Sequence, residues 1–309
     1  MLKIGNVTLA SEIILAPMAG VTDLPFRRIC KEFGCETTTS EMVSAKAMHY
    51  QDKKTMLLLQ KHESEKPYVV QIFGSDPYIM AESAKKIEDM SIADILDINM
   101  GCPAPKIVNN GDGCALMKNE KLASEILEAV VKAVKIPVTV KFRSGWDENS
   151  INALSFAKMA ENSGVSAITV HGRTREAQYS GVADHDIIAL VKDSVEIPVI
   201  ASGDIFSKRA IYEVKAKTGC DGVMVARGAL GNPFIFSEKE YSQNEILDTA
   251  IRHIDYIVET KGEYVGIKEA RKHICWYIKG MHGATQVKVA VNNSETKEQM
   301  ISAIDVLRN

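Results

Sequence analysis

The chain has 309 residues, of which 46% are hydrophobic and 25% charged, and its 37 basic and 40 acidic residues give a net charge of −3. This composition is that of an ordinary globular protein and excludes a disordered chain, a collagen-like chain and a disulfide-stapled miniprotein. At roughly 150 residues per domain, the length allows about two domains, or one barrel-sized domain with a small appendage. The charge balance argues against a surface that is basic throughout and leaves room for a local basic patch.

Eight short β-branched runs, each bounded by glycine, proline or polar residues, predict β-strands. They start about 30 residues apart, which is the size of one βα repeat. The runs lie at 13–16, 36–40, 68–72, 95–99, 138–141, 167–171, 199–202 and 222–225.

Helical patterns separate these runs. Asp76 and Pro77 begin one that reaches about residue 89, Asn119 begins one that reaches about residue 134, and Ser207 begins one that stops near Gly219. Eight strands that alternate with helices over about 235 residues favour a (β/α)8 barrel over a doubly wound sheet, which more often has five or six strands. The predicted fold is therefore an α/β TIM barrel with a small C-terminal helical domain.

The strand signal ends after Pro233, so we expect a barrel domain at 1–240 and a helical domain at 241–309, with helices near 245–260, 267–279 and 297–307. Between residues 268 and 288 five basic residues stand against Glu269 alone: Lys268, Arg271, Lys272, Lys279 and Lys288. A solvated helix face is one interpretation of this patch. Trp276 and Tyr277 beside the charges favour an RNA surface, because aromatic rings stack on bases, although they could equally anchor the helices on the barrel.

Features of membrane, exported and metal proteins are missing from the sequence. The apolar run at 13–20 is interrupted by Pro17 and is far shorter than the roughly 20 residues of a membrane span, and no basic segment precedes it. The six cysteines contain no C-x-x-C pair, so we expect reduced thiols and a cytoplasmic protein. Without H-E-x-x-H or P-loop patterns, we expect no metal and no nucleoside triphosphate. No stable protein partner is implied.

The candidate site follows from the fold, because chemistry in a (β/α)8 barrel lies at the carboxyl ends of the strands. The residues at or just after the predicted strand ends are Pro17, Met18, Ala19, Gln71, Asn99, Cys102, Lys141, Arg143, His171, Arg173, Gly203, Asp204, Arg227 and Gly228. Glycines after the last two strands occupy the place where barrels commonly bind a phosphate, although a plain turn is the alternative.

Three side chains of this rim are candidates for a catalytic or cofactor-binding role. Lys141 ends an apolar strand, where an ammonium group is costly unless an anion meets it; a reduced flavin is one such partner and a Schiff base is another possibility. His171 could donate to the same ring system, or it is a structural histidine. Cys102 is the one cysteine on the active rim, ahead of Cys114 as a candidate, although most intracellular cysteines are inert.

Seven motifs in this order and spacing resemble the flavin-dependent tRNA-dihydrouridine synthases from about residue 13 to about 281. They are LAPMAGVTDLPFR at 15–27, QIFG at 71–74, DINMGCPAPK at 97–106, KFRSGW at 141–146, HGRTR at 171–175, SGD at 202–204 and ARG at 226–228. ARKHICWYIKG at 270–280 is similar to the bacterial branch. Two departures are His185, where the family often has tryptophan, and Lys288, where an arginine is common.

The resemblance implies FMN as cofactor, NADPH as reductant and tRNA as substrate and partner. The FMN-binding residues that it implies are Pro17, Met18, Ala19, Gln71, Lys141, His171, Ser202, Gly203, Asp204, Ala226 and Arg227. Cys102 would be the proton donor, because a thiol with a pKa near ~8.5 is mostly protonated at neutral pH. Asn99 and Arg173 would hydrogen-bond the uracil edge, and Lys268, Arg271, Lys272, Lys279 and Lys288 would contact tRNA.

Two other functions stay open at this point. Another FMN barrel that acts on a free small molecule, such as a dihydroorotate dehydrogenase or an ene-reductase, would not need the basic patch. A non-catalytic tRNA-binding protein built on a barrel would hold no flavin. The sequence does not indicate which uridine is reduced, whether NADPH or NADH is preferred, or the oligomeric state.

Overall fold

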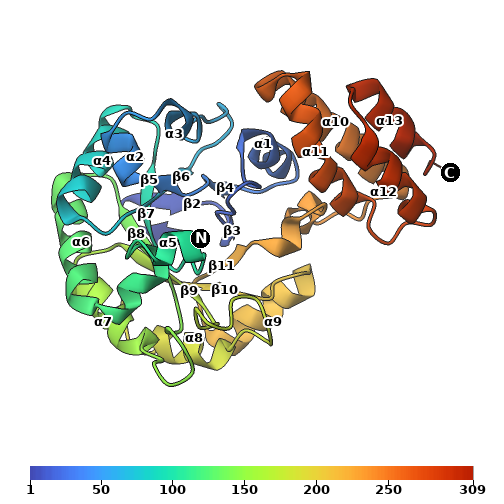
Figure 1. The fold of residues 1–309 in the computed structure, drawn as a ribbon. Helices are drawn as coiled ribbons and strands as arrows, with labels where there is room; N and C mark the ends of the chain where they lie inside the picture. The colour runs from blue at the N-terminus through green and yellow to red at the C-terminus, as the bar shows by residue number, and fades with distance from the viewer. Residues whose placement is uncertain (309) are drawn as a thin grey trace.

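The computed structural model describes residues 1–308; residue 309, the last of the predicted helical domain, lies outside them. Eight parallel strands form a closed barrel in which β11 pairs back onto β3 (Figure 1). They are β3 (Ile13–Leu15), β4 (Thr37–Thr39), β6 (Tyr68–Phe73), β7 (Ile95–Met100), β8 (Val138–Arg143), β9 (Ala167–His171), β10 (Val199–Ser202) and β11 (Gly222–Val225). The predicted barrel is therefore confirmed, with all eight strands at the expected places.

Helices surround the barrel in Figure 1. They are α1 (Leu24–Glu32), α4 (Pro77–Asp89), α6 (Glu120–Ala133), α7 (Ala153–Asn162), α8 (His185–Lys192) and α9 (Lys208–Thr218). The three predicted starts are confirmed, because the side chains of Asp76, Asn119 and Ser207 each accept a backbone N–H of the first helical turn. Gly219 ends α9 with φ 64°, a left-handed conformation that glycine adopts without steric cost.

A hairpin of β1 (Leu2–Ile4) and β2 (Val7–Leu9) closes the amino-terminal end of the barrel. Leu2, Ile4 and Leu9 form one buried cluster with residues at or near the starts of the barrel strands: Ile14, Val69, Ile95, Ala167, Ile200 and Met224. A Cβ on Gly222 would lie 2.9 Å from Leu2 Cδ2, so glycine makes room for the hairpin. The sequence did not predict these strands, because three residues are too few for a periodic pattern.

Other short elements were also not predicted. They are β5 (Val43–Ser44), α2 (Ala45–His49), α3 (Lys53–Leu57), α5 (Pro105–Val108) and the 3-10 helices η1 (Gly113–Lys118), η2 (Arg227–Ala229) and η3 (Pro233–Phe236). They lie in the connections between β4 and β6, between β7 and α6, and between β11 and α10.

The C-terminal region is helical as predicted and forms a separate lobe at the right of Figure 1. It contains α10 (Gln243–Lys261), α11 (Glu263–Tyr277), α12 (Ala284–Asn293) and α13 (Lys297–Asp305). Helix α12 was not predicted, because Val287, Val289 and Val291 alternate as in a strand. Helix α11 begins four residues before its predicted start, because Gly266 lies inside it; a Cβ there would be 3.2 Å from Val258 Cα, so glycine lets α10 and α11 pack closely.

The two lobes have separate hydrophobic clusters that meet at α1. The cluster of α10–α13 also includes Ile29 and Phe33 of α1 and Phe234 of η3. A Cβ on Gly231 would lie 2.3 Å from the carbonyl carbon of Trp276, so the chain that leaves the barrel packs directly on α11. The boundary at 240/241 stays a prediction. Within residues 1–308, no helix combines the length and the apolar character needed to cross a membrane.

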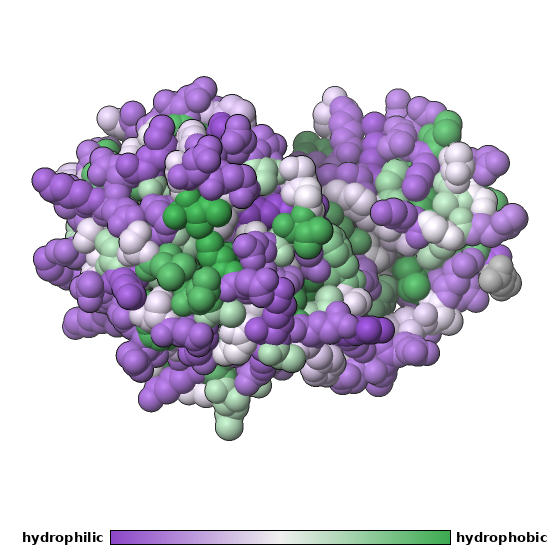
Figure 2. Space-filling model, turned by 90° about the horizontal axis from the view of Figure 1, so that it is seen from below, coloured by the Kyte–Doolittle hydropathy of each residue, from purple (hydrophilic) through white to green (hydrophobic). Residues whose placement is uncertain are grey.

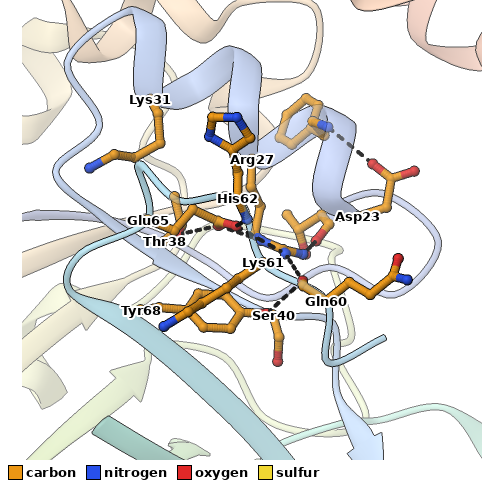
Figure 3. A network of polar contacts seen from close by, with 12 residues as sticks. Asp23, Arg27, Lys31, Thr38, Ser40, Gln60, Lys61, His62, Glu65 and Tyr68 are labelled. Carbon is orange, nitrogen blue, oxygen red and sulfur yellow. Dashed lines mark hydrogen bonds and ion pairs between the residues drawn. The ribbon is translucent and has the colours of Figure 1, made fainter. Parts of the chain in front are cut away.

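A buried ion pair joins α1 to the loop before β6 (Figure 3). Arg27 Nε lies 2.7 Å from Glu65 Oε1, and both side chains are at most 1% exposed. Arg27 also donates to the carbonyls of Thr22 and Gln60, and Glu65 accepts from the Thr38 hydroxyl at 2.7 Å. Because every charged group has a partner, the network holds α1, β4 and this loop together despite the desolvation of both charges.

Replacement of Glu65 by glutamine should destabilise the protein by about 3–5 kcal/mol, because it leaves the Arg27 charge buried without its counter-ion. Glu63→Gln, an exposed neighbour on the same loop, is the matched control and should change stability by less than about 0.5 kcal/mol. Urea unfolding followed by circular dichroism measures both. Equal unfolding midpoints for the two variants would mean that the ion pair contributes nothing.

Candidate active site

A cavity of about 630 Å³ lies at the carboxyl ends of the barrel strands. The size suits a nucleotide cofactor. All eleven predicted cofactor residues border it: Pro17, Met18, Ala19, Gln71, Lys141, His171, Ser202, Gly203, Asp204, Ala226 and Arg227. Asn99 and Cys102 border it as well. These residues come from seven strands or the loops that follow them, and they meet because parallel strands in a closed barrel all end at one rim.

Cys102 lies on the loop that follows β7. The N–H groups of Gly101 and Cys102 donate to Asn99 Oδ1 at 3.1 and 2.9 Å, so the side chain of Asn99 holds the loop in place. Burial raises the pKa of the Cys102 thiol and outweighs the opposing influence of the Ala104 N–H, Arg143 and Lys141. The thiol is therefore protonated at neutral pH and suited to donate a proton.

Lys141 and His171 face the cavity with unpaired polar atoms. Burial lowers the pKa of Lys141 to about 8, and the charge of Arg143 acts in the same direction. Burial, with a contribution from Lys141, holds the pKa of His171 well below its usual value, so the imidazole is neutral. Its buried Nδ1 has no hydrogen-bond partner among residues 1–308. Buried polar atoms without partners are rare, and here they indicate a polar ligand.

The loops after β10 and β11 form an anion cradle. Within the described chain, the N–H groups of Gly203, Arg227 and Gly228 have no hydrogen-bond acceptor. Gly203 has φ 118°, and a Cβ there would be 2.7 Å from Ala183 Cβ. A Cβ on Gly228 would lie 2.1 Å from the Ile205 carbonyl oxygen, so glycine lets the two loops approach each other. Free amides beside the Arg227 guanidinium suit a phosphate.

Arg173 does not border the cavity, and its contact with the substrate stays a prediction. Its buried guanidinium donates to the Asp204 carboxylate at 2.7 Å and to the carbonyls of Ser180 and Gly181. Arg173, two residues beyond His171, thus pairs with Asp204, while Gln178 and Tyr179 farther along the same loop border the cavity. The Ala183 N–H and Arg173 lower the pKa of Asp204 although burial acts in the opposite direction.

Several cavity residues had no predicted role. Arg143 donates to the Gly101 carbonyl at 2.9 Å and to the carbonyls of Thr174 and Gln178, so it ties the Cys102 loop to the loop after β9. Tyr179 lies beside Arg227, whose guanidinium carbon is 4.8 Å from the ring centre. Trp276 of α11 also borders the cavity. The sequence placed Arg143 at the rim without a role; it follows Lys141 by two and so faces the same side of β8.

Two residues of the predicted basic patch form hydrogen bonds within the protein. Arg271 donates to the Ser294 carbonyl at 2.7 Å, and Lys272 donates to the carbonyl of Gly20 beside the cavity. Lys268 and Lys279 are exposed, and Lys288 is half-buried. In the view of Figure 2, hydrophilic side chains cover most of the outline of both lobes, and apolar groups gather toward the middle. Lys268 and Lys279 are therefore better placed to meet an anionic partner than Arg271 or Lys272.

The fold and the cavity define an enzyme of the (β/α)8-barrel class with its active site at the carboxyl ends of the strands. The chain belongs to the dihydrouridine synthase family, whose model, described as "Dihydrouridine synthase (Dus)", matches residues 14–309. A probable tRNA-dihydrouridine synthase of Rickettsia conorii is 48% identical over 94% of this chain and 92% of its own length. The tRNA-dihydrouridine synthase B of Pseudomonas aeruginosa is 39% identical over 98% of this chain and 94% of its own.

Among solved structures, the 6-hydroxypseudooxynicotine amine oxidase of Pseudomonas geniculata N1 superposes with a TM-score of 0.60. The match covers 82% of this chain and 49% of that chain, at 15% sequence identity. At this identity the likeness concerns the fold alone.

Proposed function

We propose that this enzyme reduces specific uridines of tRNA to 5,6-dihydrouridine, with FMN as its cofactor and NADPH as its reductant. Family membership and the names of relatives that match nearly the whole chain support the reaction and the substrate. The observation that carries the proposal is the cavity itself, which combines the protonated Cys102 thiol, the unpaired Lys141 ammonium group and a cradle of free amides.

The residues of the cavity fit FMN. The amides of Gly203, Arg227 and Gly228, with the Arg227 side chain, would hold its phosphate. Gln71 of β6, Lys141 of β8 and His171 of β9 would meet the polar atoms of its ring, because all three side chains border the cavity. Pro17, Met18, Ala19, Ser202, Asp204 and Ala226 would complete the cofactor site.

The chemistry that bound, reduced FMN supplies is donation of a hydride to carbon 6 of uracil. The base then carries negative charge shared between carbon 5 and the oxygen on carbon 4, and carbon 5 needs a proton. Cys102 donates this proton from its thiol, and the resulting thiolate regains a proton from solvent. Asn99 Nδ2 donates one N–H to Gln71 Oε1, and its second N–H meets only the sulfur of Met42 at 3.8 Å, a weak acceptor that the base would replace. The Lys141 charge stabilises negative charge in the cavity.

The target base must leave its stack in the RNA to reach the cavity, at a cost of roughly a few kcal/mol. Contacts between the helical lobe and the RNA backbone would offset that cost. The exposed Lys268 and Lys279 of the basic patch would supply them.

The decisive test is the visible spectrum of the purified protein under anaerobic conditions. Flavin bands should bleach with NADPH and return only when unmodified tRNA is added. Cys102→Ala should keep the flavin and its reduction, but tRNA should restore the bands at least about 100-fold more slowly, because the proton donor is missing. Cys275→Ala, on α11 outside the cavity, is the matched control. A colourless protein that does not bind FMN would refute the function, and a normal rate with Cys102→Ala would refute the proton donor.

The affinity for FMN should fall as the pH rises through about 8. The pKa of Lys141 in the free protein is about 8. Below this pH the ammonium group is ready to donate to the cofactor, whereas above it binding must take up a proton, which weakens affinity by at most about tenfold per pH unit. Quenching of FMN fluorescence between pH 7 and 9.5 measures the effect. Lys141→Met should bind FMN more weakly and with a flat profile; a profile that still falls would assign the titration to another group.

Charge reversal of Lys268 and Lys279 together should weaken tRNA binding by about tenfold or more and leave reduction of the flavin by NADPH unchanged, because both side chains lie outside the cavity. Lys121→Glu with Lys158→Glu, on the outer faces of α6 and α7, makes the same change of charge away from the helical lobe. Filter binding at two salt concentrations compares the pairs. Equal losses for both would show a general charge effect.

A further inference from the structure

A buried carboxylate lies beneath the active site and outside the cavity lining. Asp97 is only 2% exposed, in the middle of β7. The strand register sets it beside Gln71 of β6 and Thr139 of β8. Its two oxygens accept one hydrogen bond each, from the Thr139 hydroxyl at 2.6 Å and from Gln71 Nε2 at 2.6 Å.

A chain of hydrogen bonds leads from this carboxylate to Cys102. Gln71 Oε1 accepts from Asn99 Nδ2 at 2.9 Å, and Asn99 Oδ1 accepts from the N–H groups of Gly101 and Cys102. Each amide in the chain therefore donates toward Asp97 and accepts from the side of Cys102.

The two ends of this chain of hydrogen bonds fix the orientation of the two side-chain amides between them. Backbone N–H groups can only donate, so Asn99 must present its oxygen to the Cys102 loop and its nitrogen to Gln71. Gln71 must then present its oxygen to Asn99 and its nitrogen to position 97. A carboxylate at that position can only accept, whereas an amide there could present either end and would leave both orientations possible.

We propose that Asp97 is a positioning residue for uridine reduction: its carboxylate orients Gln71 and Asn99 and thereby holds the Cys102 loop where the thiol donates its proton. The inference rests on the proposed function, because it gives Asp97 a role in the proton transfer assigned to Cys102. The role acts through three hydrogen-bonded steps, without contact between Asp97 and substrate. A displacement of about 1 Å at a reacting group is enough to lower a rate about 100-fold.

The direction of the chain can be reversed by exchanging the residues at its ends. In Asn99→Asp, the side chains at positions 97 and 99 are both carboxylates that can only accept hydrogen bonds. Gln71 can donate to only one of them, so its amide oxygen faces a carboxylate oxygen of the other. When Asp97→Asn is added, Gln71 can turn round: its nitrogen donates to position 99, its oxygen accepts from position 97, and the new amide oxygen at 97 accepts from Thr139. The carboxylate at position 99 still accepts from the N–H groups of Gly101 and Cys102.

The experiment measures kcat and KM for tRNA, FMN content and the rate at which iodoacetamide alkylates Cys102, in wild type, both single variants and the double variant. Asn99→Asp should lower kcat about 100-fold, and adding Asp97→Asn should recover about tenfold of that loss and bring the alkylation rate back toward wild type. If Asp97 had only a structural role, the double variant should have a lower kcat than Asn99→Asp alone. An additive or larger loss would overturn the proposal.

Two further comparisons keep the result interpretable. If Asn99→Asp does not fold, Asp97→Asn alone decides: a lower kcat with unchanged FMN content and faster alkylation supports the role, and unchanged kcat and alkylation overturn it. Wild-type protein that tRNA does not reoxidise would refute the proposed function, whereas active wild type without recovery in the double variant would refute only the role of Asp97.

Discussion

The pairing of β11 with β3 is the interaction on which the rest of the molecule depends. It aligns Val223–Val225 with Ile13–Leu15 in parallel and turns an open sheet into a barrel. Only in the closed barrel do the loop at 16–19 and the loop at 226–228 border the same cavity. Because all eight strands run the same way, their ends supply most polar groups of the site at one rim.

The closed barrel also explains why polar side chains survive in its interior. Gln71, Asp97 and Thr139 are buried in the middle of the barrel, where an unpaired polar group would cost roughly 1–3 kcal/mol. The register sets each beside a partner, so the three form one connected set. Toward the rim the pairing stops: Lys141, His171 and the amides of the last two loops are left for a ligand. These unpaired groups at the rim mark where binding takes place on the proposed function.

Much of this arrangement was predictable from the sequence, because it depends on local rules. Alternation and β-branching give the strands, and capping side chains such as Asp76 give the helix starts. The position of Cys102 or Lys141 at the rim follows from the fold class alone. The rest depends on contacts between distant segments. Whether Arg173 faces the cavity is decided by the path of a loop, and the role of Asp97 depends on the register of three strands. Helix α12 was missed because its valines fit a strand and only packing on α11 and α13 makes it helical.

The hairpin at the amino terminus has a kinetic consequence. Since β1 and β2 fill one end of the barrel, the rim is the way in for every reactant within the part of the chain that the structure describes. On the proposed function, the dinucleotide and the flipped base would both have to reach the flavin through this rim. On the proposed function, the oxidised dinucleotide leaves before the RNA enters. The two half-reactions would then alternate in a ping-pong sequence.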